Sequence, residues 1–217
     1  MISDYVIIML MSFLAVVMVL WYFRKRRELI RFISDIIKEL EEVFKPTDKV
    51  YELLGYLVGF KAKFKLGRSS NIVNAYAMLT TVPTYSLLYY PIAKVLTRKN
   101  LLSIAVEFRG VMSRELHMVR KDSKKFEDKL RGDVPYIDKM YLREVMSSGK
   151  TYRVYYEDPK DVDVVLNELE SLGDVGLDII QLSVFKSRST IYVVTEARVG
   201  VVRTIYRLIN TIYAKVK

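Results

Sequence analysis

The chain of 217 residues carries 35 Lys and Arg against 25 Asp and Glu, a formal net charge of +10, and contains one histidine and no cysteine. The lack of cysteine excludes a disulfide framework, a thiolate metal site and a cysteine nucleophile, and it fits a reducing interior. The sequence patterns of nucleotide-binding loops, serine hydrolases and zinc proteases are absent. We therefore expect a binding or scaffolding protein rather than an enzyme, without a cofactor. A high content of Lys, Arg, Glu and Tyr is compatible with a thermophilic source.

An apolar run near the N-terminus is the strongest feature of the sequence. Residues 5–23 read YVIIMLMSFLAVVMVLWYF, nineteen residues without a charge, a proline or a glycine. As a helix this run would be roughly 28 Å long, close to the ~30 Å hydrocarbon thickness of a bilayer. Trp21 and Tyr22 stand at its end, where aromatic rings favour the level of the lipid headgroups. The sequence therefore predicts a single transmembrane helix over residues 5–23.

Four basic residues follow the apolar run directly and set the expected orientation: Arg24, Lys25, Arg26 and Arg27. Positive charge is retained on the cytoplasmic side, so residues 1–4 would lie outside and the rest of the chain inside. A secretory signal peptide would carry its charges before the apolar run, and a soluble core helix is rarely apolar on every face. We expect a location in the cell membrane, or in an endoplasmic-reticulum-type membrane, with a cytoplasmic C-terminal domain.

Residues 24–45 are expected to form an amphipathic juxtamembrane helix that ends before Pro46. Its apolar residues recur at the three- and four-residue spacing of one helical face: Leu29, Ile33, Ile36, Leu40 and Val43. This apolar stripe could pack on the chain's own domain or dock on another membrane protein.

The positive charge is concentrated in the half of the chain nearest the anchor. Residues 24–131 hold 23 Lys or Arg against 12 Asp or Glu, whereas residues 132–217 hold 12 of each kind. This asymmetry indicates a polyanionic partner, either anionic lipid headgroups or nucleic acid, although a merely solvated basic surface would give the same count.

Residues 57–66, LVGFKAKFKL, are typical of a strand with one apolar and one basic face. Three lysines would lie on the basic face, about 6.6–7 Å from each to the next, a spacing suited to following a phosphate backbone. The alternative is that they protect an edge strand from aggregation. The candidate contacts for rRNA or lipid headgroups are Arg24, Lys25, Arg26, Arg27, Lys61, Lys63, Lys65 and Arg68.

A turn at residues 67–71 is expected to start a helix that runs to about Leu79. Residues 80–96 follow as a tyrosine-rich apolar segment that Pro83 and Pro91 interrupt, too broken for a spanning helix. The segment could be core, but beside an anchor it suits a membrane interface or an apolar partner. The candidate contacts are Tyr85, Leu87, Leu88, Tyr89, Tyr90 and Ile92.

The rest of the chain is predicted to consist of further strands and helices. Strands are predicted at residues 101–108, 114–121, 151–156, 177–186 and 189–196. Helices are predicted at residues 122–131, 136–147, 159–172 and 199–217. His117 is expected to be an ordinary strand residue, because one imidazole without clustered carboxylates is a poor set of metal ligands.

These elements predict an α+β fold for residues 57–217. Their order is strand-helix-strand-strand-helix, given twice, which we interpret as two successive βαββα units. Such an order implies an antiparallel sheet backed by helices.

The order of elements and the apolar pattern resemble the calumin family, the single-pass coiled-coil subunit of the PAT complex, an intramembrane chaperone for multipass membrane proteins. The resemblance covers most of residues 57–217 and is carried by GFKAKFKLGRSSNIVNAYAML, LLSIAVEF and ELHMVRKD, and later by DVDVVLNELESLGDVGLDIIQLSVF, STIYVVTEA and RLINTIYAKVK. The chain differs from that family in its short segment before the anchor and in the lack of a long charged coiled coil at its end. The resemblance implies a minimal, prokaryotic-type relative in which the basic first half would carry any ribosome contact.

The leading functional hypothesis is thus a non-enzymatic, membrane-anchored factor for multipass membrane-protein biogenesis. By resemblance it would act near the ribosome and the translocon, with channel subunits, a small multipass protein and rRNA as its partners, and with no small-molecule substrate. The alternative is a structural scaffold or assembly subunit of a membrane-bound complex that makes no contact with nucleic acid.

Overall fold

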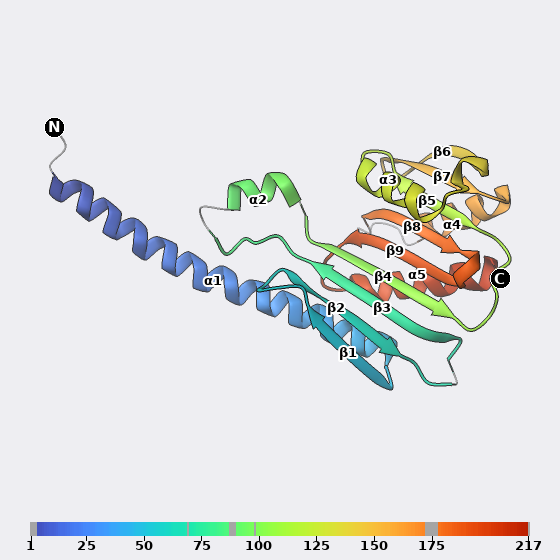
Figure 1. Ribbon diagram of the computed structural model, residues 1–217, viewed down its shortest axis with the longest axis horizontal. Helices are drawn as coiled ribbons and strands as arrows, with labels where there is room; N and C mark the ends of the chain where they lie inside the picture. Colours follow the sequence, from blue (N-terminus) through green and yellow to red (C-terminus); the bar gives the residue numbers. More distant parts are fainter. Residues whose placement is uncertain (1–3, 69, 87–89, 98, 172–177, 217) are drawn as a thin grey trace.

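The structure is a computed structural model that describes residues 4–68, 70–86, 90–97, 99–171 and 178–216. Within these residues, a long N-terminal helix leads into an α+β domain built on one nine-stranded antiparallel sheet (Figure 1). The helices are α1 (Asp4–Phe44), α2 (Tyr90–Thr97), α3 (Lys124–Asp133), α4 (Pro159–Ser171) and α5 (Val201–Val216), with 3₁₀ turns at Ile137–Lys139 and Lys186–Arg188. The strands are β1 (Asp48–Leu53), β2 (Gly59–Lys65), β3 (Ile72–Thr80), β4 (Leu101–Phe108), β5 (Leu116–Arg120), β6 (Tyr141–Ser147), β7 (Lys150–Tyr156), β8 (Ile179–Phe185) and β9 (Thr190–Glu196).

α1 is one uninterrupted helix of 41 residues, roughly 60 Å long. Its first half is long and apolar enough to cross a membrane, and its most apolar stretch is not buried against the described part of the chain. Its second half packs on the domain through the predicted apolar stripe: Leu29, Ile36 and Leu40 are buried, and Ile33 and Val43 are partly buried. Phe44, beside the stripe, is buried as well. The juxtamembrane helix is therefore a continuation of the apolar helix and a part of the domain's core.

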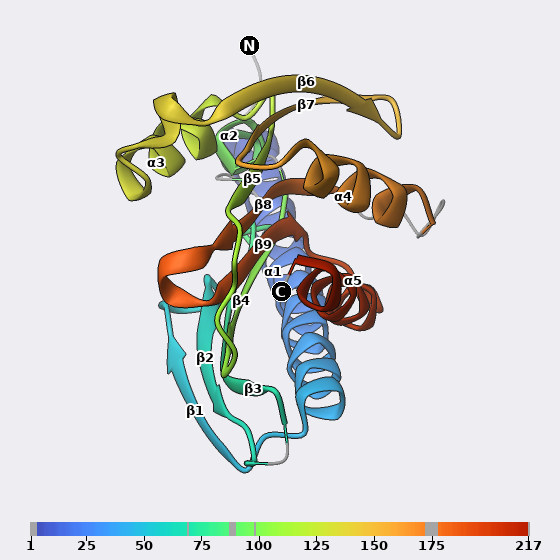
Figure 2. The same cartoon turned by 90° about the vertical axis from the view of Figure 1, so that its right-hand side faces the viewer.

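The strand order of the sheet is β1-β2-β3-β4-β9-β8-β5-β7-β6, so β1 and β6 are its edges. The second half of α1, together with α4 and α5, covers one face and buries the main hydrophobic core there. On the other face, α3 covers only the end formed by β5 and β7 (Figure 2). The remainder of this second face, over β1 to β4 and β9, carries no helix within the described residues and is called the open face below.

Residues 72–80 form β3, and the predicted helix over residues 70–79 is wrong. The buried residues Ala75, Ala77 and Leu79 alternate with the exposed Tyr76 and Met78, which is the two-residue period of a strand. β2 and β4 pair with this segment on both sides. Pairing with these neighbours thus overrides a local composition that favours a helix.

Residues 136–147 are not the predicted helix either, because they form a 3₁₀ turn and then strand β6. Ser148 and Gly149 connect β6 to β7 with φ angles of 49° and 71°. Two successive residues with positive φ are typical of the tight turn of a β-hairpin. The Ser-Gly pair was the turn signal that the helical interpretation overlooked.

The α+β class and the antiparallel sheet are confirmed, but the interpretation as two βαββα units is only half right. The second unit is present as β7-α4-β8-β9-α5, whereas the first fails because residues 72–80 are a strand. β1 was not predicted at all. All nine strands belong to one sheet rather than to two units.

Candidate functional site

Strand β2 carries a row of three exposed lysines, Lys61, Lys63 and Lys65, on the open face of the sheet. Phe60, Ala62 and Phe64 alternate with them and are buried in the core on the other face. The predicted strand with one apolar and one basic face is thus confirmed. The edge-protection alternative is wrong, because β1 pairs with β2 on its outer side and β2 is an inner strand.

The register of the sheet places further side chains beside this row. Lys63 lies opposite Val50 on β1 and Tyr76 on β3, and Tyr76 in turn lies opposite Ala105 on β4. Ala105 lies opposite Tyr192 on β9. These residues form one line across the open face, from the lysine row to the edge of α3.

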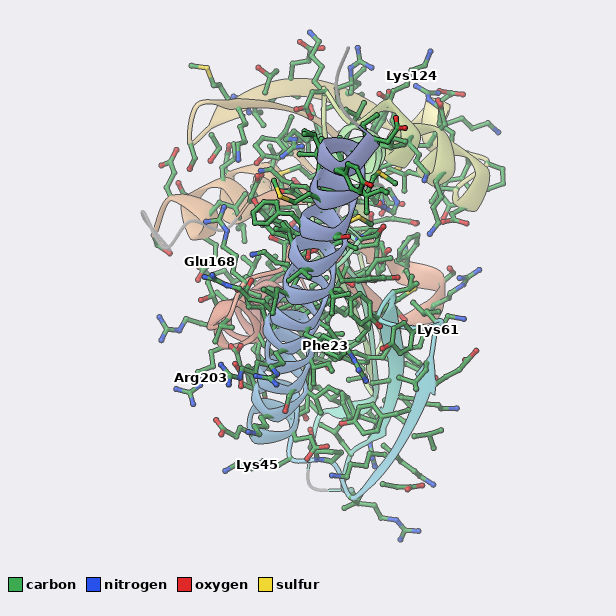
Figure 3. All side chains as sticks on the ribbon, turned by 90° about the vertical axis from the view of Figure 1, so that its left-hand side faces the viewer. Phe23, Lys45, Lys61, Lys124, Glu168 and Arg203 are labelled. Atoms are coloured by element: carbon green, nitrogen blue, oxygen red, sulfur yellow. The ribbon has the colours of Figure 1, made fainter. Side chains whose placement is uncertain are left out.

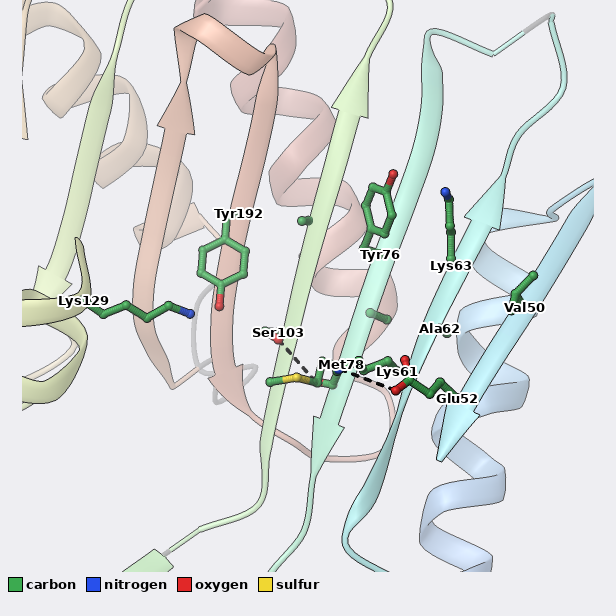
Figure 4. Close-up of a pocket in the computed structure, with 12 residues that line it drawn as sticks. Val50, Glu52, Lys61, Ala62, Lys63, Tyr76, Met78, Ser103, Lys129 and Tyr192 are labelled. Atoms are coloured by element: carbon green, nitrogen blue, oxygen red, sulfur yellow. Dashed lines mark hydrogen bonds and ion pairs between the residues drawn. The ribbon is translucent and has the colours of Figure 1, made fainter. Parts of the chain in front are cut away.

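A hollow of about 460 Å³ lies along this line on the open face (Figure 4). Three of its twelve lining residues are lysines and one is acidic, so its surroundings are net positive. Its lining residues are Val50, Glu52, Lys61, Ala62, Lys63, Tyr76, Ala77, Met78, Ser103, Ala105, Lys129 and Tyr192. The lysines come from β2 on one side and from α3 on the other.

The lysines of the hollow are largely free to bind a partner. Lys61 makes only a loose ion pair with Glu52, at 3.8 Å between Nζ and Oε1. Within the described residues, Lys63 and Lys129 form no ion pair; instead, their Nζ atoms lie 5.6 and 5.9 Å from the ring centroids of Tyr76 and Tyr192, respectively. Since ammonium groups over aromatic rings stay exposed to solvent on their outer side, they can contact an anion without losing that interaction.

Three other carboxylates lie on the strands of the open face, outside the hollow, and one of them, Glu196 of β9, pairs with Lys99 and Arg198. The register places Asp48 and Glu107 in the row of Lys65, at the end of the strand. Glu107 is engaged, because the side-chain nitrogen of Asn74 donates a hydrogen bond to its Oε2 at 2.8 Å. The positive character of the face is therefore strongest around Lys61, Lys63 and Lys129.

The basic cluster after the apolar helix is separate from the hollow. Arg24 and Lys25 pair with Glu28 on the same helix, at 3.3 and 2.6 Å. The guanidinium carbon of Arg26 lies 5.7 Å from the ring centroid of Tyr56, while Arg27 is exposed. Arg68, in the loop after β2, is also exposed. The structure thus divides the predicted anionic contacts into a helix cluster and a sheet row.

The tyrosine-rich segment folds back onto α1 at the end of the apolar run. Trp21 donates a hydrogen bond from Nε1 to the carbonyl oxygen of Thr84 at 3.1 Å, and its ring lies 6.2 Å from that of Tyr90. Tyr85 packs edge-on against Tyr22, with ring centroids 6.0 Å apart. These contacts join the end of the apolar run of α1 to the segment just before α2 and to its first residue. They lie at the predicted level of the lipid headgroups.

The other predicted apolar contacts divide into two sets. Ile92 is exposed on α2, as is its neighbour Val95, which leaves an apolar surface on this helix. Leu87, Leu88 and Tyr89 lie outside the described residues. The prediction of a membrane interface or an apolar partner for this segment remains a prediction.

Ten of the twelve lining residues of the hollow, among them Tyr76, Lys129 and Tyr192, are not among the candidates predicted from the sequence. Tyr76 had been assigned to a helix, and Tyr192 and Lys129 belong to elements more than fifty residues further along the chain. The period-two alternation of residues 72–80 was the one signal that could have placed Tyr76 beside the lysines. The register of β4 and β9 brings Tyr192 into the site, and the position of helix α3 brings Lys129 beside it.

His117 is fully buried in β5 and is not part of the hollow. Its Nε2 lies 3.1 Å from Oε1 of Glu115, and Tyr136 donates a hydrogen bond to the other oxygen of that carboxylate at 2.7 Å. In the part of the chain that the structure describes, no three potential metal ligands lie close together.

Comparison with known proteins gives no relative from which a function could be transferred: no protein-family model and no curated protein matches the chain. The features that bear on function are the geometry of the open face and its position beside the apolar helix.

Proposed function

We propose that this chain is a non-enzymatic, membrane-anchored factor for the biogenesis of multipass membrane proteins, and that it binds the ribosome through rRNA on the open face. The observation that carries the proposal is the net positive hollow around Lys61, Lys63 and Lys129, in a domain joined rigidly to a helix that is long and apolar enough to cross a membrane. The resemblance of the sequence to the calumin family supports a role in membrane-protein biogenesis. The positive charge of the hollow supports a contact with rRNA.

The anchor is proposed to place the domain on the cytoplasmic side. Arg24 to Arg27 follow the apolar run, and positive charge next to a spanning helix is retained in the cytoplasm. The second half of α1 is part of the domain core, so the open face keeps a fixed direction relative to the membrane. A fixed basic face close to the bilayer suits a partner as large as a ribosome, whose surface is rich in phosphate.

Charge reversal on β2 tests the proposal. In Lys61→Glu/Lys63→Glu/Lys65→Glu, we expect ribosome binding by the full chain in detergent micelles to fall at least about tenfold in a co-sedimentation assay, because three phosphate contacts are lost. The slope of log affinity against log salt concentration should also flatten by roughly two to three units.

A matched control reverses three charges on the opposite side of the sheet: Lys38→Glu/Lys160→Glu/Arg207→Glu. These exposed residues lie on α1, α4 and α5, which cover the other face. Figure 3 shows how the two sides separate, with Lys61 on one side of the molecule and Glu168 of α4 and Arg203 of α5 on the other. Equal loss of binding in both triple variants, or no loss in the β2 variant, would reject the open face as the ribosome contact.

A further inference from the structure

The two tyrosines of the hollow lie on one line across the sheet. Tyr76 of β3 and Tyr192 of β9 both lie opposite Ala105 of β4, so their side chains point to the same face. Adjacent strands are about 4.8 Å apart, which puts their Cα atoms roughly 9–10 Å from each other. The small side chain of Ala105 leaves the space between the two rings open.

The ring of Tyr76 is exposed, and the ring of Tyr192 is half-buried and held in place. Tyr76 is 39% exposed in the middle of the sheet, where a large aromatic side chain would usually be covered. The hydroxyl group of Tyr192 interacts with the side chain of Ser103, which in turn donates a hydrogen bond to the carbonyl oxygen of Met78 at 3.3 Å. Figure 4 shows the ring of Tyr192 lying over β9 between Lys129 and Ser103.

A lysine accompanies each ring. Lys63 lies beside Tyr76 and Lys129 beside Tyr192, so the hollow offers two pairs of a flat aromatic surface and a positive charge. A nucleotide presents the complementary pair, a flat base and a phosphate. Anionic lipid headgroups would satisfy the lysines but would leave the two rings without a partner.

We propose that the hollow binds single-stranded RNA, with unpaired bases stacked on Tyr76 and Tyr192 and the phosphates held by Lys61, Lys63 and Lys129. The inference rests on the proposed function, and it assigns the RNA contact to an unpaired segment rather than to a duplex. Bases inside a duplex are already stacked on each other, so tyrosine rings gain nothing from them. Bases in loops and single strands are free to stack on aromatic side chains, commonly on the open face of a sheet.

The test compares two RNAs on the full chain in detergent micelles by fluorescence anisotropy. The probes are a short fluorescein-labelled oligouridylate and an RNA duplex of the same length. We expect Tyr76→Leu and Tyr192→Leu each to weaken binding of the single strand by roughly 5- to 150-fold, the range for loss of one stacked base, and to leave binding of the duplex unchanged. The salt dependence should be unchanged in both variants, because no phosphate contact is removed.

Two further variants separate stacking from damage to the fold. Tyr76→Phe and Tyr192→Phe keep the rings and should bind the single strand as the unmodified chain does. Tyr141→Leu removes a tyrosine that is 69% exposed on the edge strand β6, outside the hollow, and should have no effect on either RNA.

The outcomes distinguish this inference from the proposed function. The stacking inference is overturned if the leucine variants bind the single strand as tightly as the unmodified chain does. It is also overturned if they lose affinity for the single strand and for the duplex equally. Neither result affects the outcome of the ribosome-binding assay. Selective loss of the single strand supports the inference even in the case that ribosomes fail to co-sediment, and the biogenesis proposal alone would then be rejected.

Discussion

Gly59, at the start of β2, occupies a position where a side chain has no room. Its φ angle is +140°, and a Cβ atom built there would lie 1.9 Å from the carbonyl oxygen of Leu79 on the paired strand. Only glycine allows the backbones of β2 and β3 to approach this closely. This approach sets the register that aligns Lys61 and Lys63 with Met78 and Tyr76.

Replacement of this glycine should therefore disturb the site as well as the fold. We expect Gly59→Ala to lower the free energy of unfolding by at least about 2–3 kcal/mol, since the strained backbone and the clash add together. Urea unfolding of the full chain in micelles measures the change. Gly132→Ala in α3 is the control: no atom lies within 4 Å of the position that its Cβ atom would take, so it should be neutral or slightly stabilising. Similar losses in both variants would contradict the close approach of β2 and β3.

Asp178, just before β8, pairs with three cations: Lys99 before β4, Arg120 of β5 and Lys150 of β7. Its side chain is only 6% exposed and lies 2.9 Å from Lys99, 2.6 Å from Arg120 and 2.5 Å from Lys150. Burial alone would raise the pKa of this carboxyl, but the three cations outweigh it and lower the pKa to about 2. The ordinary value in an unfolded chain is 3.8.

The direction of this shift predicts how stability depends on pH. Because the folded pKa is below the unfolded one, the ionised carboxylate stabilises the fold fully above about pH 4, and this contribution is lost as the pH falls towards 2. Its size is about 2 kcal/mol. Urea unfolding at a series of pH values should show this acid-dependent loss in the unmodified chain and lack it in Asp178→Asn.

Asp163→Asn provides the comparison for this measurement. Asp163 also faces an arginine, Arg143, but at 3.6 Å and with both side chains more than half exposed. An exposed pair of this kind contributes less than about 0.5 kcal/mol. An acid-dependent loss that persists unchanged in Asp178→Asn would show that other carboxylates are responsible.

At the scale of elements, α1 and α5 are joined by a carboxylate at a helix end. Glu39 of α1 accepts hydrogen bonds from the backbone N–H groups of Gly200 at 2.8 Å and Arg203 at 3.2 Å. These N–H groups lie at the start of α5, where a helix has no internal acceptor for them. A negative charge at this end is also favourable to the helix dipole.

Loss of this carboxylate should loosen α5 from α1. We expect Glu39→Ala to lower the free energy of unfolding by about 1–2 kcal/mol, the usual range for a helix cap. Hydrogen exchange should show faster opening of the first turn of α5. Glu42→Ala removes a neighbouring acid whose ion pair with Arg203 is mostly exposed, and its effect should stay below about 0.5 kcal/mol. Equal effects of the two variants would argue against the cap.

The success of sequence-based prediction differed between elements for a physical reason. The helices α1, α4 and α5 were predicted because they are long and apolar or strongly periodic. The spacing of apolar residues within each segment is enough to indicate a helix. β1, β3 and β6 were missed or assigned to helices, since their conformation is decided by neighbouring strands. Within the site, the lysine row on β2 follows from local alternation, whereas its register with Tyr192 is a long-range property.

One helix joins the apolar segment to the folded domain. α1 runs from the apolar segment into the core of the domain without interruption, and the contacts of Trp21 and Tyr22 with Thr84, Tyr85 and Tyr90 support it at the predicted membrane surface. The domain therefore has little freedom to rotate about the apolar half of α1. If the helix spans the bilayer, the strands of the open face run away from the membrane alongside it (Figure 1).

Because α1 and the domain are packed together, the basic face has a fixed orientation relative to α1, and a partner would approach it from one side. The lysine row begins close to the turn between β1 and β2, where Tyr56 contacts Tyr22 and Arg26, and continues away from the apolar half of α1. A partner bound there would lie beside the membrane rather than far above it. The scaffold alternative needs no such face, since its contacts would be with membrane subunits.

The most direct test of the central claim is a pull-down of the full chain from native membranes in a mild detergent, with the captured RNA and proteins identified at low and at high salt. The account predicts rRNA, ribosomal proteins and channel subunits at low salt, with the ribosome released at high salt because phosphate contacts dominate the interaction. A salt-resistant set of other membrane subunits without rRNA would contradict the account and favour the scaffold.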